Sequence, residues 1–389
     1  IRILARTGES DHRPGRQRPL RPQRIPVSRK IYIYPTHKPG PYLPEDYLQS
    51  FHDAFRAHPG VRLVNRGGRL GVASLFLNLD ARVFIIHWVD LIVFKKFGRL
   101  QFLVFLAGIW TLIGLRKQIV WVLHNRQAHN GPHPWVDFAM SLMAKHAHLV
   151  LTHSEAGVAF FREQYGACDG DKVFHLPLPA YRAEIVPAAA SQWDYVIWGS
   201  ITPRKRVAEF LEYATQEPFF RDKRILVCGI CLDPAYARRI ACLAKGPIEF
   251  IQKFLAREEL DGYLARSTCI LFTYSPASVL SSVALVYSLN FNKPIIGPAI
   301  GNFLDLKGVV QCYRTFAELP GLDIAQPPDT ALIQRYLAEN TWARFPQKLL
   351  DRLESGGRSG PILRPGERLT GRPPRGPGDR SARGRSPRS

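Results

Sequence analysis

The chain has 389 residues, of which 46% are hydrophobic, and this is enough for two α/β domains of about 150 residues each. A formal net charge of +21 would suit a nucleic-acid-binding protein, but residues 1–30 and 352–389 each carry +7 and leave only +7 on the body of the chain. No aromatic residues that could stack on bases are interleaved with the basic residues of these ends. We therefore expect no nucleic-acid partner, and a basic nucleic-acid-binding protein is kept as the alternative from another functional class.

Both ends of the chain are rich in Arg, Pro and Gly and poor in large apolar residues. Such segments bury too little apolar surface to offset the entropy lost on ordering, so we expect residues 1–30 and 351–389 to be disordered tails. Solvated tails are the simplest interpretation, and contact with an anionic membrane stays open.

Cysteine usage and apolar segments favour a cytoplasmic protein. The six cysteines form no disulfide framework, and Cys228 and Cys231, a C-x-x-C pair at the end of an apolar run, are interpreted as buried thiols. The first residues lack the apolar core of a signal peptide, and the most apolar stretch, residues 102–115, is shorter than the roughly 20 residues that span a bilayer. Basic residues flank this stretch on both sides, so peripheral contact with the inner face of the cytoplasmic membrane is a further expectation.

Apolar strand-like runs alternate with helix-length segments, which indicates parallel sheets with crossover helices. In the first half, strands are predicted at residues 30–34, 61–64, 83–88, 119–123, 149–152 and 172–175. Helices are predicted at residues 45–57, 94–115, 136–147 and 155–165. The Pro-rich stretch 176–187 interrupts this rhythm and marks a linker between two domains.

The same alternation begins again after the linker. Strands are predicted at residues 195–198, 224–228, 248–251, 269–274 and 294–297. Helices are predicted at residues 207–213, 234–244, 257–265 and 281–290. The predicted fold class is therefore α/β, with two Rossmann-like domains, residues 31–180 and 181–350, that face one another across a cleft.

Three strand ends of the predicted second domain carry residues that suit a phosphate group. Ligands of open α/β sheets bind at the carboxyl ends of the strands. The first segment, G-S-I-T-P-R-K-R, combines Gly199, where the backbone can approach a phosphate, with Lys205 and its positive charge near a helix start. A basic solvated turn explains this segment alone equally well.

The second segment places Ser278, Ser281 and Ser282 at the start of another helix, where hydroxyl and amide groups can bind an anion or simply cap the helix. The third segment, N-K-P-I-I-G-P at residues 292–298, leads a buried strand into a Gly/Pro loop. The order and spacing of all three segments are more specific than any one of them.

These three segments resemble the donor half of GT-B glycosyltransferases. In the first half, H-W-V-D at residues 87–90 and L-H-N at residues 123–125, with His129, end two predicted strands. They resemble the H-W-x-acid and L-H-N-x-x-x-H segments of bacterial exopolysaccharide glycosyltransferases, especially the β-mannosyltransferases of xanthan-type assembly, and of related family 4-like enzymes. The resemblance covers about residues 31–310.

The resemblance implies a hexosyltransferase of polysaccharide biosynthesis. Its second domain would bind a GDP- or UDP-linked sugar, and its first domain a glycan or polyprenyl-diphosphate-linked acceptor. Carried onto this chain, the donor site comprises Gly199, Arg204, Lys205, Ser278, Ser281 and Ser282. No cofactor or metal is expected, because Lys, Arg and helix amides can neutralise the leaving diphosphate.

The chain departs from the resembling enzymes at two places. Many retaining GT-B enzymes carry an E-x7-E motif, whose two positions fall on Val279 and Tyr287 here. Neither residue is acidic, which favours an inverting reaction and also keeps open a GT-B-like protein without activity. The usual Tyr-Lys-Gly is Arg204-Lys205-Arg206, so the donor contacts are expected to differ.

An inverting reaction needs a general base for the acceptor hydroxyl. Asp90 and His124 end two strands that we expect to be neighbours, and we predict Asp90 as the base and His124 as the residue that places the acceptor, with exchanged roles as the alternative. Structural roles also stay open: Asp90 could cap a helix, and His124 could be a satisfied core histidine. His129 and His133 do not complete a metal-ligand set.

Overall fold

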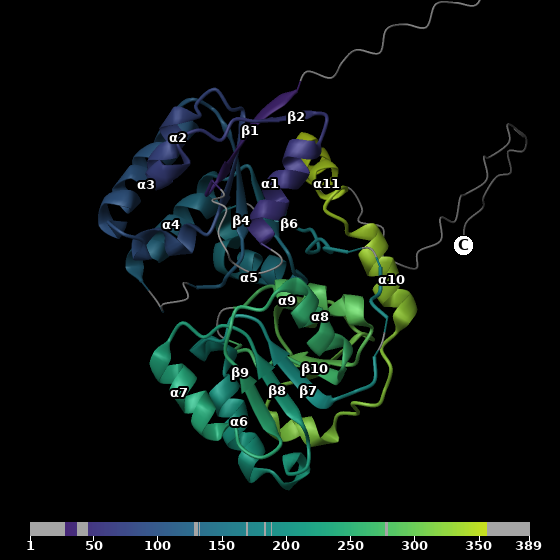
Figure 1. Ribbon diagram of the computed structural model, residues 1–389. Helices are drawn as coiled ribbons and strands as arrows, with labels where there is room; N and C mark the ends of the chain where they lie inside the picture. Colours follow the sequence, from purple (N-terminus) through teal and green to yellow (C-terminus); the bar gives the residue numbers. More distant parts are fainter. Residues whose placement is uncertain are drawn as a thin grey trace, which may run out of the picture. The chain divides into compact units, whose positions relative to one another are not determined.

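The computed structural model describes residues 28–36, 46–127, 131, 133–168, 170–182, 184–187, 189–276 and 279–355. It contains two parallel six-stranded sheets (Figure 1). In spatial order, the first sheet is β2 (Val61–Leu63), β1 (Arg29–Tyr34), β3 (Val83–His87), β4 (Gln118–Leu123), β5 (Leu149–Thr152) and β6 (Val173–His175). The second is β12 (Val310–Tyr313), β11 (Ile295–Pro298), β10 (Ser267–Leu271), β7 (Trp193–Trp198), β8 (Ile225–Cys228) and β9 (Ile248–Ile251). The predicted α/β class with two Rossmann-like domains is confirmed.

Helices cover both faces of the first sheet because its strands are apolar on both sides. Along β1, Ile31 and Ile33 face one apolar cluster, whereas Tyr32 and Tyr34 face another. The helical segments are α1 (Tyr47–Ala57), η1 (Gly68–Ala73), α2 (Ser74–Leu77), η2 (Val89–Phe94), α3 (Gly98–Gly114), α4 (Pro134–His146) and α5 (Glu155–Tyr165). Two short 3-10 turns, η3 (Gly166–Cys168) and η4 (Gly170–Lys172), precede β6. No helix in the described part of the chain is long and apolar enough to cross a bilayer.

The second sheet is built in the same way. Along β7, Tyr195 and Ile197 pack on one face, and Val196 and Trp198 on the other. Its α-helices are α6 (Val207–Gln216), α7 (Pro234–Leu243), α8 (Arg257–Ala265) and α9 (Val283–Ser288). Its 3-10 segments are η5 (Pro203–Lys205), η6 (Pro218–Phe220), η7 (Leu289–Phe291), η8 (Gly301–Phe303) and η9 (Phe316–Gly321). Cys228 and Cys231 are buried free thiols, as predicted.

The last two helices connect the second sheet back to the first domain. They are α10 (Thr330–Glu339) and α11 (Phe345–Glu354). Phe345 of α11 packs edge-on against Phe51 of α1, and Arg29 of β1 forms an ion pair of 2.6 Å with Glu354. The predicted second domain, residues 181–350, did not include this contact of α11 with the first domain.

Several predicted boundaries need correction. The helix predicted at 94–115 begins at Gly98, because the 3-10 segment η2 ends at Phe94 and the N-cap Phe97 has a left-handed φ of +58°. The strand predicted at 269–274 ends at Leu271, because the chain then turns to hydrogen-bond the Arg204–Lys205 loop. Residues 29–30 and 351–354, predicted to belong to the tails, lie in β1 and α11. The rest of the predicted tails lies outside the described residues.

Candidate active site

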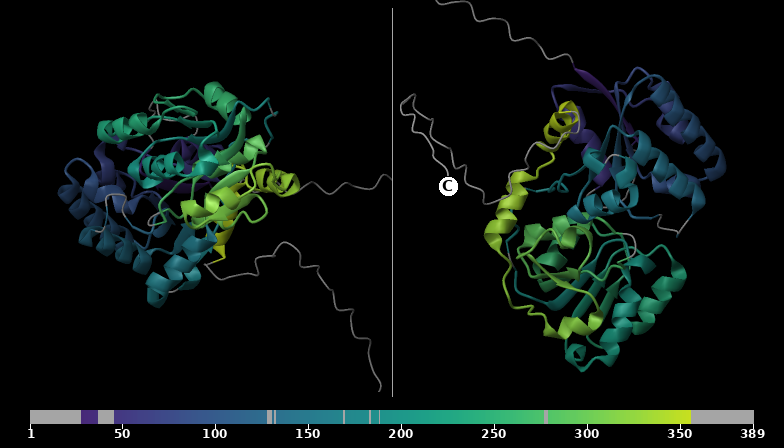
Figure 2. Two further views of the ribbon diagram at one scale, coloured as in Figure 1. Left: turned by 90° about the horizontal axis from the view of Figure 1, so that it is seen from below. Right: turned by 180° about the vertical axis from the view of Figure 1, so that it is seen from behind.

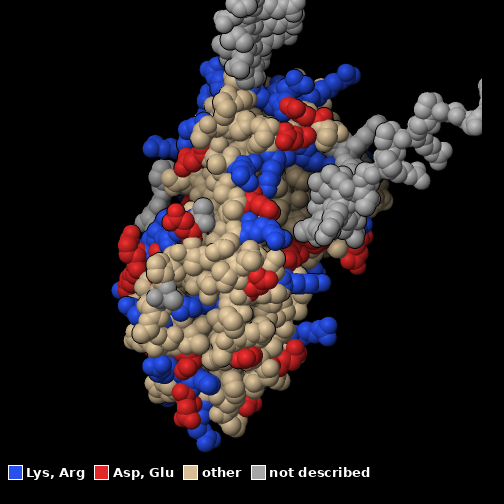
Figure 3. All heavy atoms as spheres, turned by 90° about the vertical axis from the view of Figure 1, so that its right-hand side faces the viewer, with Lys and Arg blue, Asp and Glu red and all other residues tan. Residues whose placement is uncertain are grey.

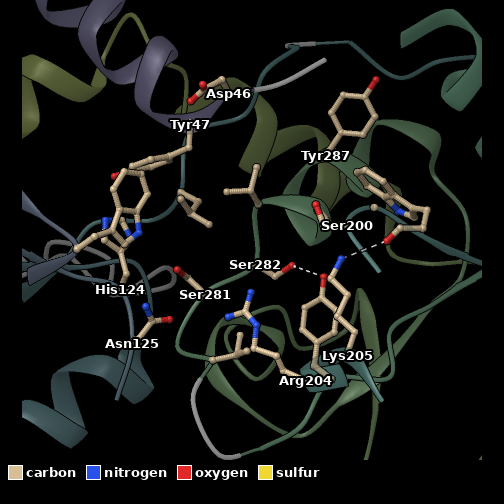
Figure 4. Close-up of a pocket in the computed structure, with 18 of the residues that line it drawn as sticks. Asp46, Tyr47, His124, Asn125, Ser200, Arg204, Lys205, Ser281, Ser282 and Tyr287 are labelled. Atoms are coloured by element: carbon tan, nitrogen blue, oxygen red, sulfur yellow. Dashed lines mark hydrogen bonds between the residues drawn. The ribbon is translucent and has the colours of Figure 1, made fainter. Parts of the chain in front are cut away.

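A pocket of about 470 Å³ lies where loops after strands of both sheets meet, within the size range of small-molecule sites (Figure 4). The first domain lines it with Asp46, Tyr47, Trp88, His124 and Asn125. The second domain lines it with Trp198, Gly199, Ser200, Arg204, Lys205, Leu260, Tyr274, Val279, Ser281, Ser282, Val283, Ala284 and Tyr287, and Leu178 completes the wall. All the predicted site residues except Asp90 and Ser278 therefore meet in one pocket. Ser278 lies outside the described residues.

Gly199 and Lys205 form a close pair at the end of β7. The Lys205 Nζ donates a 3.4 Å hydrogen bond to the Trp198 carbonyl and lies 5.1 Å from the centre of the Tyr274 ring. Gly199 has a φ of +103°, and a Cβ there would lie 2.9 Å from the Lys205 Nζ. A glycine at this position therefore satisfies the backbone conformation and leaves room for the ammonium group.

Backbone contacts with residues 273–275 hold the Arg204–Lys205 loop in place. The Ser275 N–H donates to the Arg204 carbonyl at 2.8 Å, and the Thr273 hydroxyl donates to the Lys205 carbonyl. Burial lowers the pKa of Arg204, whereas the nearby Asp90 carboxylate acts to raise it. Because a guanidinium stays protonated in proteins, this wall carries two positive charges.

Arg206 occupies the position of the glycine in the Tyr-Lys-Gly pattern. Its φ is +52°, the left-handed conformation that glycine adopts without a steric penalty. Its guanidinium lies 4.7 Å from the centre of the Phe316 ring, a favourable cation–π contact. Arg206 thus has a backbone conformation that a glycine would adopt more easily.

The two serines of the second segment differ in their contacts. Ser282 is the N-cap of α9: its Oγ accepts from the Leu285 N–H at 3.2 Å, and its own N–H donates to Asn302 Oδ1 at 2.9 Å. These two hydrogen bonds give Ser282 a structural role at the start of α9. Ser281 lines the pocket beside it (Figure 4).

The predicted adjacency of the H-W-V-D and L-H-N segments is confirmed. β3 and β4 are parallel neighbours, with His87 paired to Val122. The rings of Trp88, His124 and His87 form one cluster: the His124 centroid is 4.9 Å from that of Trp88 and 5.2 Å from that of His87, and the Trp88 and His87 centroids are 5.6 Å apart. Trp88 has a φ of +47°, an uncommon conformation for a bulky residue that marks a candidate functional position.

Asp90 lies behind the pocket wall. It is only 6% exposed, belongs to η2, and its Oδ2 accepts a 3.1 Å hydrogen bond from the Asn125 amide. Burial raises the pKa of Asp90, and the Asn125 hydrogen bond and the Arg204 charge partly offset this rise. Of the two predicted catalytic residues, His124 therefore lines the pocket. Asp90 does not line it, but is hydrogen-bonded to Asn125, which does.

Two buried histidines support the first-domain wall. His153 Nδ1 is 2.8 Å from the Leu176 carbonyl, and its Nε2 is 2.8 Å from the Tyr47 hydroxyl. Burial lowers the pKa of His153 to about 4 and that of His87 to well below its usual range. Because a carbonyl only accepts, His153 Nδ1 carries the proton, and its neutral Nε2 accepts from Tyr47. This hydrogen bond fixes Tyr47 at the edge of the pocket.

Sequence reasoning missed Asp46 and Tyr47. Asp46 is the one carboxylate among the described residues that line the pocket, and its Oδ1 accepts from the Leu48 and Gln49 amides at 2.8 and 3.2 Å. The predicted helix 45–57 included Asp46, whereas α1 begins at Tyr47 and Asp46 is its N-cap. An aspartate at a helix start was the available signal.

The two positions of the E-x7-E motif both line the pocket, although neither is acidic. The Tyr287 hydroxyl donates to Asp261, which also accepts a 2.5 Å hydrogen bond from Arg182 of the linker. His133 is the N-cap of α4, and His129 lies outside the described residues. No group of three or more potential metal ligands occurs in the described part of the chain.

Comparison with known proteins shows the same architecture. No protein-family model matches the chain, and no curated protein matches it in sequence. Anabaena HepE in complex with UDP-glucose aligns with a TM-score of 0.60 and 14% identity over 84% of this chain and 99% of that chain. A glycosyltransferase from Rickettsia africae aligns with a TM-score of 0.54 and 12% identity over 85% and 98% of the two chains.

Sucrose-phosphate synthase from Thermosynechococcus elongatus has a TM-score of 0.53 and 14% identity over 85% of this chain and 95% of that chain. The chain therefore has the GT-B fold, in which two Rossmann-like domains meet at one pocket. Its structural neighbours thus include a protein solved with UDP-glucose and a protein described as a glycosyltransferase.

Proposed function

We propose that the chain is a glycosyltransferase that moves a sugar from a nucleotide diphosphate-sugar to a glycan acceptor. The observation that carries this proposal is the pocket, in which Arg204 and Lys205 of one domain lie across from His124 of the other (Figure 4), and which Trp88 also lines. Fixed cations suit a leaving diphosphate, and aromatic rings suit the apolar faces of sugars. The fold shared with HepE, whose structure contains UDP-glucose, supports this class of donor.

The second-domain wall is the proposed donor site. Lys205 supplies a compact charge and Arg204 a planar guanidinium, the two forms in which proteins usually bind phosphate. Negative charge grows on the diphosphate as its bond to the sugar breaks, and cations already in place stabilise that charge. The Gly199 backbone and the Ser281 hydroxyl complete the wall, and the proposal includes no cofactor or metal besides the donor.

A recess of about 20 Å³ opens beside Gly199, and we propose that the nucleoside extends from the main pocket towards it. Gly229, Ile230, Phe254 and Leu255 line it together with Trp198 and Leu260, which the recess shares with the main pocket. Gly229 approaches Gly199 so closely that a Cβ on Gly229 would meet the Gly199 carbonyl oxygen at 2.0 Å. We propose UDP as the first nucleotide to test, because HepE is described with UDP, and GDP as the alternative.

We propose an inverting reaction in which His124 takes the proton from the acceptor hydroxyl. His124 lines the pocket, whereas Asp90 is buried behind Asn125, and this difference favours the exchange of the two roles predicted from the sequence. The 3.0 Å hydrogen bond between His124 Nε2 and His87 Nδ1 would then orient the imidazole, and His124 Nδ1 would be the atom that takes the proton. Asp90 would hold Asn125, and Asp46 is a further carboxylate that could serve as the base.

The acceptor is proposed to be a glycan, in particular one linked to a polyprenyl diphosphate, in polysaccharide biosynthesis. Tyr47 and Trp88 give the first-domain wall two aromatic rings, with centroids 6.1 Å apart, on which a sugar ring can pack. A lipid-linked acceptor would bring the protein to the surface of a membrane. The sequence resemblance supports this acceptor class, and the transferred sugar is proposed to be a hexose.

A thermal-shift screen tests the donor proposal. A ligand that binds only the folded protein at 100 times its dissociation constant stabilises it by about 2.7 kcal/mol. We expect UDP or GDP to raise the melting temperature and the matching nucleoside monophosphate to raise it less, because one phosphate engages fewer cations. If no nucleoside diphosphate shifts the melting temperature of the folded protein, the proposal is wrong.

A second assay separates an enzyme from a GT-B-like protein without activity. Release of UDP or GDP from UDP-sugars or GDP-sugars, with extracted lipid-linked glycans as acceptors, reports turnover. Binding without release under these conditions would support the inactive alternative, for which the non-acidic Val279 and Tyr287 are the structural motive.

A further inference from the structure

Helix α3 is apolar on two sides. Its inner side packs into the first domain through buried residues that include Phe102, Phe105, Ile109 and Leu112. Its outer side presents Phe97, Leu100, Leu103 and Trp110 to solvent, with exposed fractions of 69%, 61%, 60% and 54%. These four residues lie three or seven positions apart, so they form one stripe about 20 Å long on the helix surface. A helix of a water-exposed domain normally places polar residues there.

Neighbouring elements widen this stripe into a larger apolar surface. Of the thirteen large apolar side chains that are exposed in the described part of the chain, ten lie between residues 70 and 138. Beside the stripe they are Leu70, Phe76, Leu77, Phe94, Leu115 and Phe138. They belong to η1, α2, η2, the end of α3 and α4, which lie on one flank of the first sheet and pack against one another (Figures 1 and 2). We call these ten side chains the α3 face.

The charges on α3 and on the residues that flank it have one sign. The sequence contains no Asp or Glu between Asp90 and Asp137, but it contains six Lys and Arg residues in that interval. Lys96 and Arg99 lie at the beginning of α3, and Arg116 and Lys117 directly follow its end. None of these four forms an ion pair with another described residue, and the Lys96 Nζ lies 5.2 Å from the centre of the Phe97 ring.

Two acidic residues lie on neighbouring elements. Asp137 is exposed on the first turn of α4, and Asp80 forms ion pairs with Lys30 and Arg66. The face that carries α10 and α11 is different: basic and acidic side chains are interspersed over it (Figure 3). Such mixing is typical of a surface that stays in water.

We propose that the α3 face is a docking surface for an anionic lipid bilayer. The exposed stripe of α3 enters the boundary between headgroups and acyl chains, and Lys96, Arg99, Arg116 and Lys117 contact the lipid phosphates at the two ends of the helix. The long basic side chains can lie along the apolar surface while their charges reach the headgroups. At 17 residues, α3 would lie in the membrane plane, since no described helix is suited to cross a bilayer.

The chain connects this surface directly to the acceptor side of the pocket. Trp88 lines the pocket at the end of β3, and η2 then leads to Phe97, the first residue of the stripe. A docked protein would therefore hold its first-domain wall near the bilayer, where a lipid-linked acceptor is found. This second step rests on the proposed function, whereas lipid binding by the α3 face does not require it.

Sedimentation with lipid vesicles tests the docking surface with the full chain. The probes are vesicles of phosphatidylcholine with and without phosphatidylglycerol, at about 0.05 M and about 0.5 M salt, because salt screens only the charge contacts. The apolar variant is Leu100→Gln with Leu103→Gln, which keeps helix propensity and side-chain size. Its matched control is Leu232→Gln, an exposed leucine of the second domain with an exposed fraction of 78%.

We expect the vesicle partition coefficient of the double variant to be at least tenfold lower than that of the unaltered chain. At high salt, the unaltered chain should keep some binding, and the double variant should show none. Leu232→Gln should bind like the unaltered chain. Replacement of Lys96 and Arg99 by Gln should lower binding at low salt by about fivefold per residue, and replacement of Arg221 and Lys245 of the second domain should not. The tails are unchanged in every variant, so their charge cannot produce these differences.

Equal vesicle binding by the double variant and Leu232→Gln would overturn the proposal. A change of sedimentation coefficient in the double variant without lipid would also overturn it, because the α3 face would then be the contact between two copies of the chain. Nucleotide-induced thermal stabilisation, measured on the same samples, shows that each variant is folded. That readout also separates failure of lipid docking from failure of the proposed donor site.

Discussion

The two walls of the pocket differ in chemistry, although both are formed by loops at the carboxyl ends of parallel strands. The second-domain wall has two cations, a glycine that leaves room for one of them, and hydroxyl groups. The first-domain wall has aromatic rings and an imidazole, supported from behind by neutral histidines. A diphosphate requires positive charge, whereas a sugar acceptor requires a stacking surface and a proton acceptor. This asymmetry supports our proposal that the second-domain wall binds the donor and the first-domain wall binds the acceptor.

The largest expected effect concerns proton transfer at the first-domain wall. His124→Ala should lower turnover by about 10²–10⁴-fold while nucleotide binding is retained, because a general base contributes this much to rate. Asp90→Asn, which keeps the side-chain shape beside Asn125, should lower turnover less than His124→Ala does. Asp46→Asn, which keeps an acceptor for the α1 amides, tests the remaining carboxylate.

Steady-state release of the nucleoside diphosphate is the measurement for all three variants. A loss in Asp90→Asn of more than about a hundredfold, with His124→Ala nearly unaffected, would return the role of base to Asp90. The same pattern in Asp46→Asn would move it to Asp46.

Acid should weaken the first-domain wall selectively. The pKa of His153 is about 4 in the folded chain, below the value of about 6.5 of an unfolded histidine, so the unfolded state binds the proton more tightly. The stability from this neutral histidine is fully present above pH 6.5 and is lost as the pH falls towards 4, which amounts to about 3 kcal/mol. The lost hydrogen bond to Tyr47 should accompany this change.

Urea unfolding at a series of pH values measures this effect. Between pH 6.5 and 4, the unfolding free energy of the unaltered chain should fall by about 3 kcal/mol more than that of His153→Gln. His58→Gln is the control, since His58 lies at the end of α1 and is not fully buried. Parallel pH curves for the unaltered chain and His153→Gln would show that the wall does not depend on a neutral His153.

A smaller effect is expected where the second-domain wall approaches the phosphate. Gly199→Ala places a methyl group 2.9 Å from the Lys205 Nζ and forces a φ of +103° on a residue with a Cβ. We expect a strain of about 1–2 kcal/mol and a weaker affinity for UDP or GDP, because the ammonium must move. Gly246→Ala is the control: it has a φ of +62° but nothing within 4 Å of the added Cβ.

Unfolding and titration calorimetry of both variants separate the two causes. The control should lose stability and keep its nucleotide affinity, whereas Gly199→Ala should lose both. Unchanged affinity in Gly199→Ala would mean that the crowding of Lys205 has no bearing on the donor.

The sequence predicted the second-domain wall better than the first. Gly199 and Lys205 lie six residues apart after one strand, so local pattern and turn chemistry are enough to bring them together. The neighbouring strands behind Trp88 and His124 were also predictable, because apolar strands alternating with helices indicate a parallel sheet.

The missed features depend on tertiary contacts between residues far apart in sequence. Asp46 and Tyr47 line the pocket because α1 packs against the first sheet. The Tyr47 hydroxyl also hydrogen-bonds to His153, which lies 106 residues further along the chain, directly after β5. The return of α11 to β1 and α1 joins residues more than 300 positions apart in the Arg29–Glu354 pair. The left-handed conformation of Arg206 could not be predicted, because arginine, unlike glycine, does not indicate a positive φ in a sequence.

Isothermal titration of UDP and GDP into the unaltered chain, Lys205→Ala and Lys245→Ala tests the central claim most directly. Lys205 lines the pocket, and Lys245 is an exposed lysine of the same domain outside it. We expect Lys205→Ala to weaken binding of the preferred nucleotide by about 1.5–3 kcal/mol, the contribution of a hydrogen bond to a charged group, and Lys245→Ala to leave it unchanged. Equal nucleotide affinity in a folded Lys205→Ala protein and in the unaltered chain would contradict the assignment of the donor to the second-domain wall.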